Sequence, residues 1–252
     1  SFGNYVSKKT KEDSNTLVDF AKLIKSIENE NKERAKVENK SDLFGKGVFV
    51  AADTNRNQDF TGYAQLLEFA VKVNANNVQA ISLLADEYKS SGKKRNAVDL
   101  YLKYIRLADL PENNGKLPLY EVYKSLAQLY TDLKQYVVAS SYYEKMVELL
   151  KSDKKEDPYL YYQLGSFYSQ RLGNAEKSSE YFTVWVNWLD QKRKEEKEKR
   201  EKDKDFGISL EETVRRLSFE FTASYAIASY HKQMQYPVEE SIYLDRAYDS
   251  YK

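Results

Sequence analysis

One apolar pattern occurs twice in this chain of 252 residues, with a shift of 42 positions. The first copy places its side chains at the i, i+3, i+4 and i+7 spacing that marks one helix face: Ile81, Leu84, Ala85 and Tyr88. A second helix face follows, and its small residue Ala97 comes 12 positions after Ala85. The second copy keeps this interval, because Ala127 and Ala139 are again 12 positions apart. Two helix faces at a constant interval predict a repeated helical hairpin.

A third copy begins 38 residues after the second. The first helix face of the second copy is Tyr123, Leu126, Ala127 and Tyr130, and that of the third is Tyr161, Leu164, Gly165 and Tyr168. The turn of the third copy, at residues 171–174, is one residue longer. The chain holds only 9 glycines and 4 prolines, and so few turn-forming residues favour helices throughout.

The pattern Ile/Tyr-x2-Leu-Ala/Gly-x2-Tyr at residues 81–88, 123–130 and 161–168 resembles the tetratricopeptide repeat (TPR) family, whose unit is a helical hairpin of about 34 residues. The resemblance is clearest over residues 81–185. It implies an all-α, TPR-like right-handed solenoid of helical hairpins, with atypical helices at both ends. In such a fold each hairpin buries its apolar face against its neighbours.

We predict a flexible leader at residues 1–13 and a single all-α domain over residues 14–252. The hairpins are expected near residues 46–76, 79–108, 119–151 and 158–190, and the first of these is a degenerate copy. An amphipathic helix at residues 16–37 is expected to cap the N-terminal end of the stack, with one apolar side formed by Leu17, Phe20, Ile24 and Ile27.

The rest of the chain is a charged segment at residues 191–205 and a pair of C-terminal helices at residues 209–252. The charged segment is either a solvated helical extension or a mobile linker, and pairs such as Glu196/Arg200 have the favoured i, i+4 spacing. The first C-terminal helix is expected to start at the capping box Ser209-x-x-Glu212. Its apolar side is assigned to Leu217, Phe221, Tyr225 and Ala228.

Composition excludes several classes of function. With 40 basic and 39 acidic residues the net charge is +1, which gives no field for capturing nucleic acid. The chain has no cysteine and one histidine, so thiol chemistry and sites with two imidazoles are excluded. The oxygen-rich run at residues 53–59 lacks the glycine and glutamate of a calcium loop. We therefore expect no metal, no cofactor and no catalytic residue, and the sequence has no apolar run of transmembrane length.

The TPR resemblance implies binding of a protein or peptide, as a scaffold or adaptor, through a concave groove lined by the first helices. By the same resemblance the groove positions are Gln79, Ser82, Asp86, Lys89, Glu121, Lys124, Gln128, Thr131, Tyr159, Tyr162, Ser166 and Ser169. Partner contact is expected at Tyr159 and Tyr162, whereas His231, Trp185 and Trp188 are expected to pack between helices. The family's clamp for a C-terminal carboxylate is not expected, because Lys124 alone fits its pattern.

Two alternatives are kept. One is a hydrolase or lyase of a bacterial envelope that uses the groove carboxylates Asp86 and Glu121. The other is a structural envelope protein that associates with itself. A complex with a different protein is favoured over self-association. The polar leader and the missing initiator methionine slightly favour an exported envelope protein, with a lipid anchor upstream of Ser1, over a cytoplasmic one.

Overall fold

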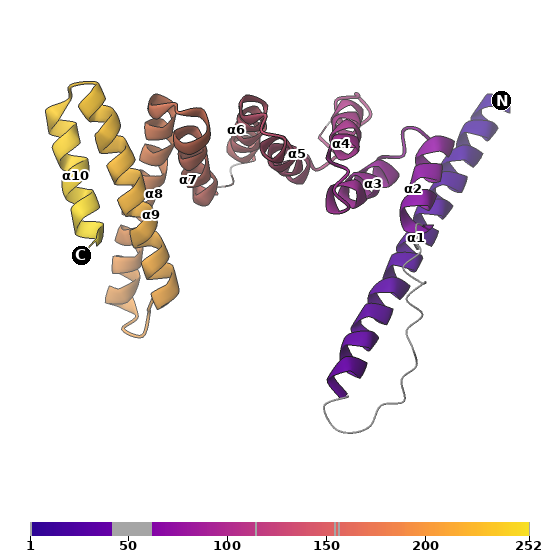
Figure 1. The fold of residues 1–252 in the computed structure, drawn as a ribbon, viewed down its shortest axis with the longest axis horizontal. Helices are drawn as coiled ribbons and strands as arrows, with labels where there is room; N and C mark the ends of the chain where they lie inside the picture. Colours follow the sequence, from indigo (N-terminus) through magenta and orange to yellow (C-terminus); the bar gives the residue numbers. More distant parts are fainter. Residues whose placement is uncertain (1, 42–61, 114, 154, 156, 252) are drawn as a thin grey trace. The chain divides into compact units, whose positions relative to one another are not determined.

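The computed structural model describes residues 2–41, 62–113, 115–153, 155 and 157–251. Over these residues the chain forms helices and no strand (Figure 1), which confirms the predicted all-α fold. It divides into two compact units, Ser1–Val122 and Tyr123–Lys252, where a single domain was predicted. The division is physically reasonable, because each hairpin of a repeat protein contacts mainly its neighbours and compactness is therefore local.

The first unit contains α1 (Phe2–Ser41), α2 (Gly62–Val73), α3 (Val78–Ser90) and α4 (Lys94–Ala108). Helix α2 contacts both α1 and α3, and α3 pairs with α4 in a hairpin. Helix α1 begins at Phe2 and therefore includes most of the segment predicted as a leader. Ser14 links α1 to the end of α2 and the start of α3: its hydroxyl donates to the carbonyl of Ala70 at 2.8 Å and accepts from the side-chain amide of Asn77 at 2.7 Å.

The buried side of α1 differs from the predicted one. Val18 and Ala21 are fully buried and pack in one cluster with Leu67 and neighbouring residues of α2, whereas Phe20 is 58% and Ile27 49% exposed. Together with Ser14 the buried residues form an i, i+4, i+7 row of small side chains. Small side chains allow the two helices to approach closely, and this explains why the larger apolar residues lie outside the contact.

The first helix of the degenerate hairpin, expected near residues 46–52, lies outside the described residues, as does the oxygen-rich run at residues 53–59. The second helix of that hairpin is α2. In the described part of the chain its helical partner is α1.

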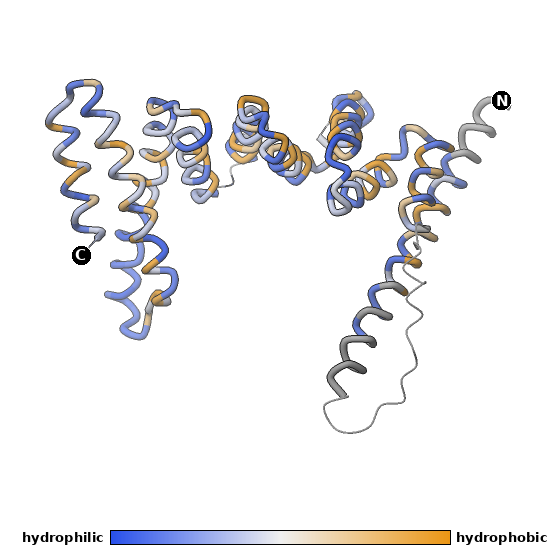
Figure 2. The backbone as a smooth tube through the Cα atoms, in the orientation of Figure 1, coloured by the Kyte–Doolittle hydropathy of each residue, from blue (hydrophilic) through white to orange (hydrophobic). Residues whose placement is uncertain are grey.

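The second unit contains most of α5 (Tyr120–Asp132), then α6 (Tyr136–Ser152), α7 (Pro158–Phe167), the π-helical turn η3 (Tyr168–Leu172), α8 (Ala175–Lys202), α9 (Leu210–Gln233) and α10 (Pro237–Tyr251). Helix α7 pairs with α8, α8 contacts α9, and α9 pairs with α10. The charged segment is helical up to Lys202. It forms the last part of α8, which is hydrophilic in Figure 2. None of the helices in the described ranges combines the length and the apolar character needed to cross a membrane.

Local chemistry explains the boundaries of α7 and α8. Asp157 caps α7 by accepting from the Leu160 amide, and Pro158 occupies the first turn, where its missing N–H is not needed. The longer turn of the third copy is taken up by η3, whose i→i+5 bonding accommodates an extra residue. Gly173 then adopts a left-handed φ of 62°, and Asn174 caps α8.

The hairpins close on the small residues of the repeat. Ala85, Ala97, Ala127 and Ala139 are all fully buried. At the matching position of the third copy, Gly165 faces the ring of Phe182 so closely that an added Cβ would lie 2.6 Å from its Cδ1. The contact between α7 and α8 therefore requires glycine, although Ala85 and Ala127 occupy this position in the other copies.

We expect Gly165→Ala to lower the free energy of unfolding by about 2 kcal/mol, because overpacking outweighs alanine's better helix propensity. Urea unfolding followed by tryptophan fluorescence measures this in the second unit, since both tryptophans lie in α8. Gly207→Ala is the control, because nothing lies within 4 Å of the position that its added methyl group would take and its φ is not left-handed. Equal stability of the two variants would contradict the close-approach explanation.

Candidate partner-binding site

In the first unit, the groove positions of α3 lie on the side opposite its core. Gln79 and Asp86 are exposed, and Ser82 and Lys89 are half-buried. The intervening residues Ile81, Leu84 and Ala85 are buried. Glu121, in the first turn of α5, is exposed as well.

Asp86 has a hydrogen-bond partner within its own hairpin. The hydroxyl of Tyr101 on α4 donates to its carboxylate at 2.5 Å. This contact ties α3 to α4 and gives Asp86 a structural role, which is a simpler account of the residue than the predicted acid–base pair with Glu121.

In the second unit, the groove positions of α5 are again polar and accessible. Lys124 and Gln128 are exposed, while Leu126 and Ala127 between them are completely buried. Thr131 is half-buried, and its hydroxyl donates to the carbonyl of Ala127 at 2.7 Å. The accessible part of this face is therefore formed by a lysine and a glutamine.

The third set of groove positions is half-buried or exposed, and its two tyrosines contact α9. The ring of Tyr162 stacks on Phe219 with a centroid distance of 4.0 Å, and the hydroxyl of Tyr159 donates to Glu212 at 2.6 Å. Both tyrosines are half-buried and make these contacts inside the second unit, and partner contact at them stays a prediction. Ser166 is half-buried and Ser169 is exposed.

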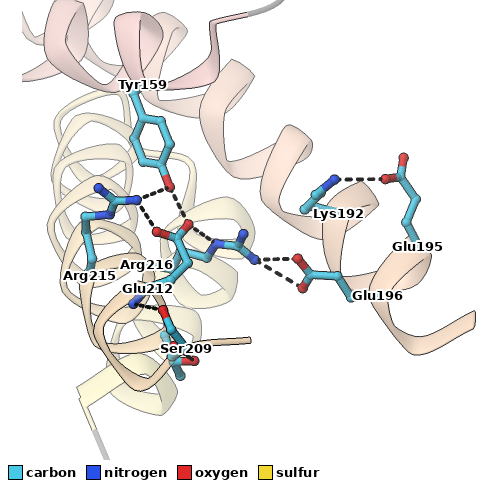
Figure 3. Close-up of polar contacts among 9 residues, drawn as sticks. Tyr159, Lys192, Glu195, Glu196, Ser209, Glu212, Arg215 and Arg216 are labelled. Carbon is cyan, nitrogen blue, oxygen red and sulfur yellow. Dashed lines mark hydrogen bonds and ion pairs between the residues drawn. The ribbon is translucent and has the colours of Figure 1, made fainter. Parts of the chain in front are cut away.

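A charged junction that includes Tyr159 joins α7, α8 and α9 (Figure 3). Glu212 accepts from Tyr159, from Arg216 Nε at 2.6 Å and from Arg215. Arg216 also donates to both carboxylate oxygens of Glu196, at 2.8 and 3.1 Å. Burial alone would raise the pKa of Glu212, but these hydrogen bonds and the charge of Arg216 outweigh it and lower the pKa to about 2.

The junction changes two predictions. Ser209 caps α9 as expected, since its hydroxyl accepts from the Glu212 amide at 3.2 Å, but the Glu212 carboxylate binds Tyr159 and Arg216. Glu196 was expected to pair with Arg200 along its own helix. It pairs instead with Arg216 on α9, because its side chain faces α9 and is 8% exposed.

A second ionic group lies farther along the same helices. The Glu220 side chain is 3% exposed and accepts from both terminal nitrogens of Arg193, at 2.8 and 2.6 Å. Arg246 on α10 contacts the same carboxylate at 2.8 Å and binds Asp190 through two hydrogen bonds. The hydrogen bond from Arg246 is the main cause that lowers the pKa of Asp190.

The sequence did not lead us to predict this second ionic group, and the apolar side assigned to α9 lies partly outside the buried face that the structure shows. Ala228 is buried as assigned, but Phe221 and Tyr225 are 39% and 57% exposed, and the fully buried residues are Ala223 and Ile227. Glu220 precedes these two by three and seven positions and so shares their helix face. This spacing was the sequence signal that could have placed Glu220 on the buried face of α9.

The predicted packing roles of His231, Trp185 and Trp188 agree with the structure. His231 stacks on Tyr243 with a centroid distance of 5.8 Å and an interplanar angle of 9°. Trp185 is fully buried in the cluster formed by α8 and α9, and Trp188 is half-buried against it.

The successive antiparallel helices, their spacing and their buried small residues agree with the predicted repeat. The hairpins are tetratricopeptide-like. No family model matches the chain, and no curated protein matches it.

Solved structures offer distant similarities. YrrB, described as a TPR protein with an unusual peptide-binding site, is 14% identical, with a TM-score of 0.49 over 99% of this chain and 92% of that chain. BtubC from P. vanneervenii is 14% identical, with a TM-score of 0.47 over 96% and 90% of the two chains. MamA is 16% identical, with a TM-score of 0.44 over 78% and 91%. Because the TM-scores are below 0.5, we base the fold on this chain's own hairpins.

Proposed function

We propose that this chain is a non-catalytic interaction module that binds a protein or peptide, as a scaffold or adaptor, through the polar faces of its first helices. The observation that supports this proposal is the division of α3 and α5 into a fully buried side and an exposed polar side at the positions that the repeat assigns to partner contact. Gln79 and Asp86 on α3, and Lys124 and Gln128 on α5, are accessible.

The chemistry of these faces suits recognition of a polypeptide. The amide and carboxylate groups of α3, and the amide and ammonium groups of α5, can donate to and accept from an extended backbone, and helical repeats present such groups on rigid elements. In the third set, Tyr159 and Tyr162 are half-buried against α9, so less of that face is accessible. Within the second unit the proposal therefore depends on α5.

The test is quantitative affinity capture with the full chain and two double variants. Lys124→Ala with Gln128→Ala alters the proposed face, and Glu148→Ala with Lys151→Ala alters exposed positions of α6 outside it. We expect the α5 variant to recover its main protein partner about tenfold less well, which corresponds to about 1.4 kcal/mol of binding free energy. The α6 variant should recover the partner as the unaltered chain does.

Two results would contradict the proposal. One is equal recovery by both double variants, which would place any binding elsewhere. The other is a chain that enriches no protein above background in several lysates.

A further inference from the structure

A cavity of about 410 Å³ lies between the charged last part of α8 and the start of α9. Its α8 side is formed by residues at the i, i+3, i+4 and i+7 spacing of one helix face: Arg193, Glu196, Lys197 and Arg200. Its α9 side includes Arg216. Four of these five side chains are cationic, although residues 191–205 as a whole are nearly balanced in charge.

Ion pairs with nearby carboxylates neutralise part of the positive charge that lines the cavity. Arg193 is paired with Glu220, and Arg216 with Glu196 and Glu212, so these cations are neutralised by carboxylates of the second unit. Glu196 is the one acid in the lining, and both of its oxygens are bound by Arg216.

Two cations remain beyond these pairs. Lys197 and Arg200 are exposed and form no ion pair or hydrogen bond with any residue that the structure describes. They lie at i and i+3 on the side of α8 that faces the cavity. A ligand carboxylate could reach both without displacing an existing pair, and charge-assisted bonds of this kind are stronger than neutral ones.

The remaining lining is apolar. Ile208, from the loop between the two helices, and Leu217 of α9 contribute half-buried side chains to the cavity wall. An aliphatic side chain of a ligand would bury apolar surface there. The site thus combines two unpaired cations with an adjacent hydrophobic surface.

We infer that this cavity binds an acidic segment of a protein partner, with carboxylates on Lys197 and Arg200 and an aliphatic side chain against Ile208 and Leu217. The inference rests on the proposed function and adds the chemistry of one contact, at a surface separate from the face of α5. It also gives the charged end of α8 a binding role that its overall charge balance conceals.

The test uses a fluorescein-labelled Glu-Leu-Glu-Glu-Leu-Glu peptide, its Gln-Leu-Gln-Gln-Leu-Gln analogue and inorganic phosphate, each added to the full chain. Fluorescence anisotropy measures peptide affinity, and the methyl signals of Ile208 and Leu217 locate binding. Lys197→Gln with Arg200→Gln removes the unpaired charges. Lys194→Gln with Lys202→Gln is the matched control, because it removes the same charge from exposed positions outside the cavity.

We expect the acidic peptide to shift the Ile208 signal and to bind about tenfold more weakly to the cavity variant, while the control variant keeps its affinity. The glutamine analogue should not bind. Equal loss in both variants, no shift of the Ile208 signal, or the same variant-dependent shift with phosphate alone would overturn the inference. Partner capture that depends on α5 but not on Lys197 and Arg200 would leave the proposed function intact and reject this site.

Discussion

Glu220→Gln is expected to lower the free energy of unfolding by about 3 kcal/mol, because a neutral amide replaces the buried carboxylate that accepts charge-assisted hydrogen bonds from two arginines. Glu220 is the shared acceptor of Arg193 and Arg246, and its side chain is 3% exposed. Glutamine has nearly the same shape, so the loss would reflect charge and hydrogen bonding with little change in packing. Urea unfolding followed by the fluorescence of Trp185 and Trp188 measures it in the unit that contains Glu220.

Glu211→Gln provides the matched control, since it makes the same chemical change at an exposed position of α9. We expect that control to change stability by a few tenths of a kcal/mol, through the weak attraction between an acid and the start of a helix. Equal stability of the two variants would mean that the two arginines find other partners, and the ionic group would then have no special weight in this unit.

The hairpins could be predicted because the repeat constrains each small residue twice, once by helix spacing and once by its interval to the next copy. Ala85 and Ala97 satisfy both conditions, and so do Ala127 and Ala139, and all four are buried. For helices that have no second copy in the sequence, only the helix spacing could be used. In α1 and α9 several faces contain apolar residues, and the largest side chains, Phe20 and Phe221, suggested sides that the structure exposes.

The charged groups of the second unit could not be assigned from spacing along one helix. Glu196 has an ideal partner four positions away, yet it binds Arg216 of α9, because a half-buried guanidinium in a shared contact is better shielded from water than an exposed one. Similarly, Tyr159 and Tyr162 occupy groove positions by register, and only the docking of α9 on α7 determines that both are half-buried against it. These outcomes depend on how the helices pack, which the repeat pattern does not encode.

Stability is expected to fall in acid more steeply in the unaltered chain than in a Glu212→Gln variant. The pKa of Glu212 is lowered to about 2 in the folded state from an ordinary value of 4.5. The unfolded chain therefore takes up a proton at this group at higher pH than the folded chain does. The stabilisation is complete above about pH 4.5 and is lost as the pH falls toward 2, and its full size is about 3 kcal/mol.

Between pH 6 and pH 3 this one group should account for a loss of about 2 kcal/mol. The measurement is the free energy of unfolding at the two pH values for the unaltered chain, Glu212→Gln and the control Glu211→Gln. The control should keep the full acid dependence, whereas Glu212→Gln should lack this share of it and be less stable at pH 6. Parallel pH profiles for all three proteins would contradict the assignment.

Tyr159→Phe separates the hydrogen bond from the ion pairs in the same group. It removes one donor to Glu212 and leaves Arg216 and Arg215 in place. Because the carboxylate then loses part of what stabilises its charged form, its pKa should rise from about 2 toward the ordinary value, and the acid transition should start at higher pH. An unchanged transition would mean that the arginines alone set the pKa of Glu212, and that Tyr159 joins α7 to α8 and α9 through its ring contacts with Trp188 and Phe219.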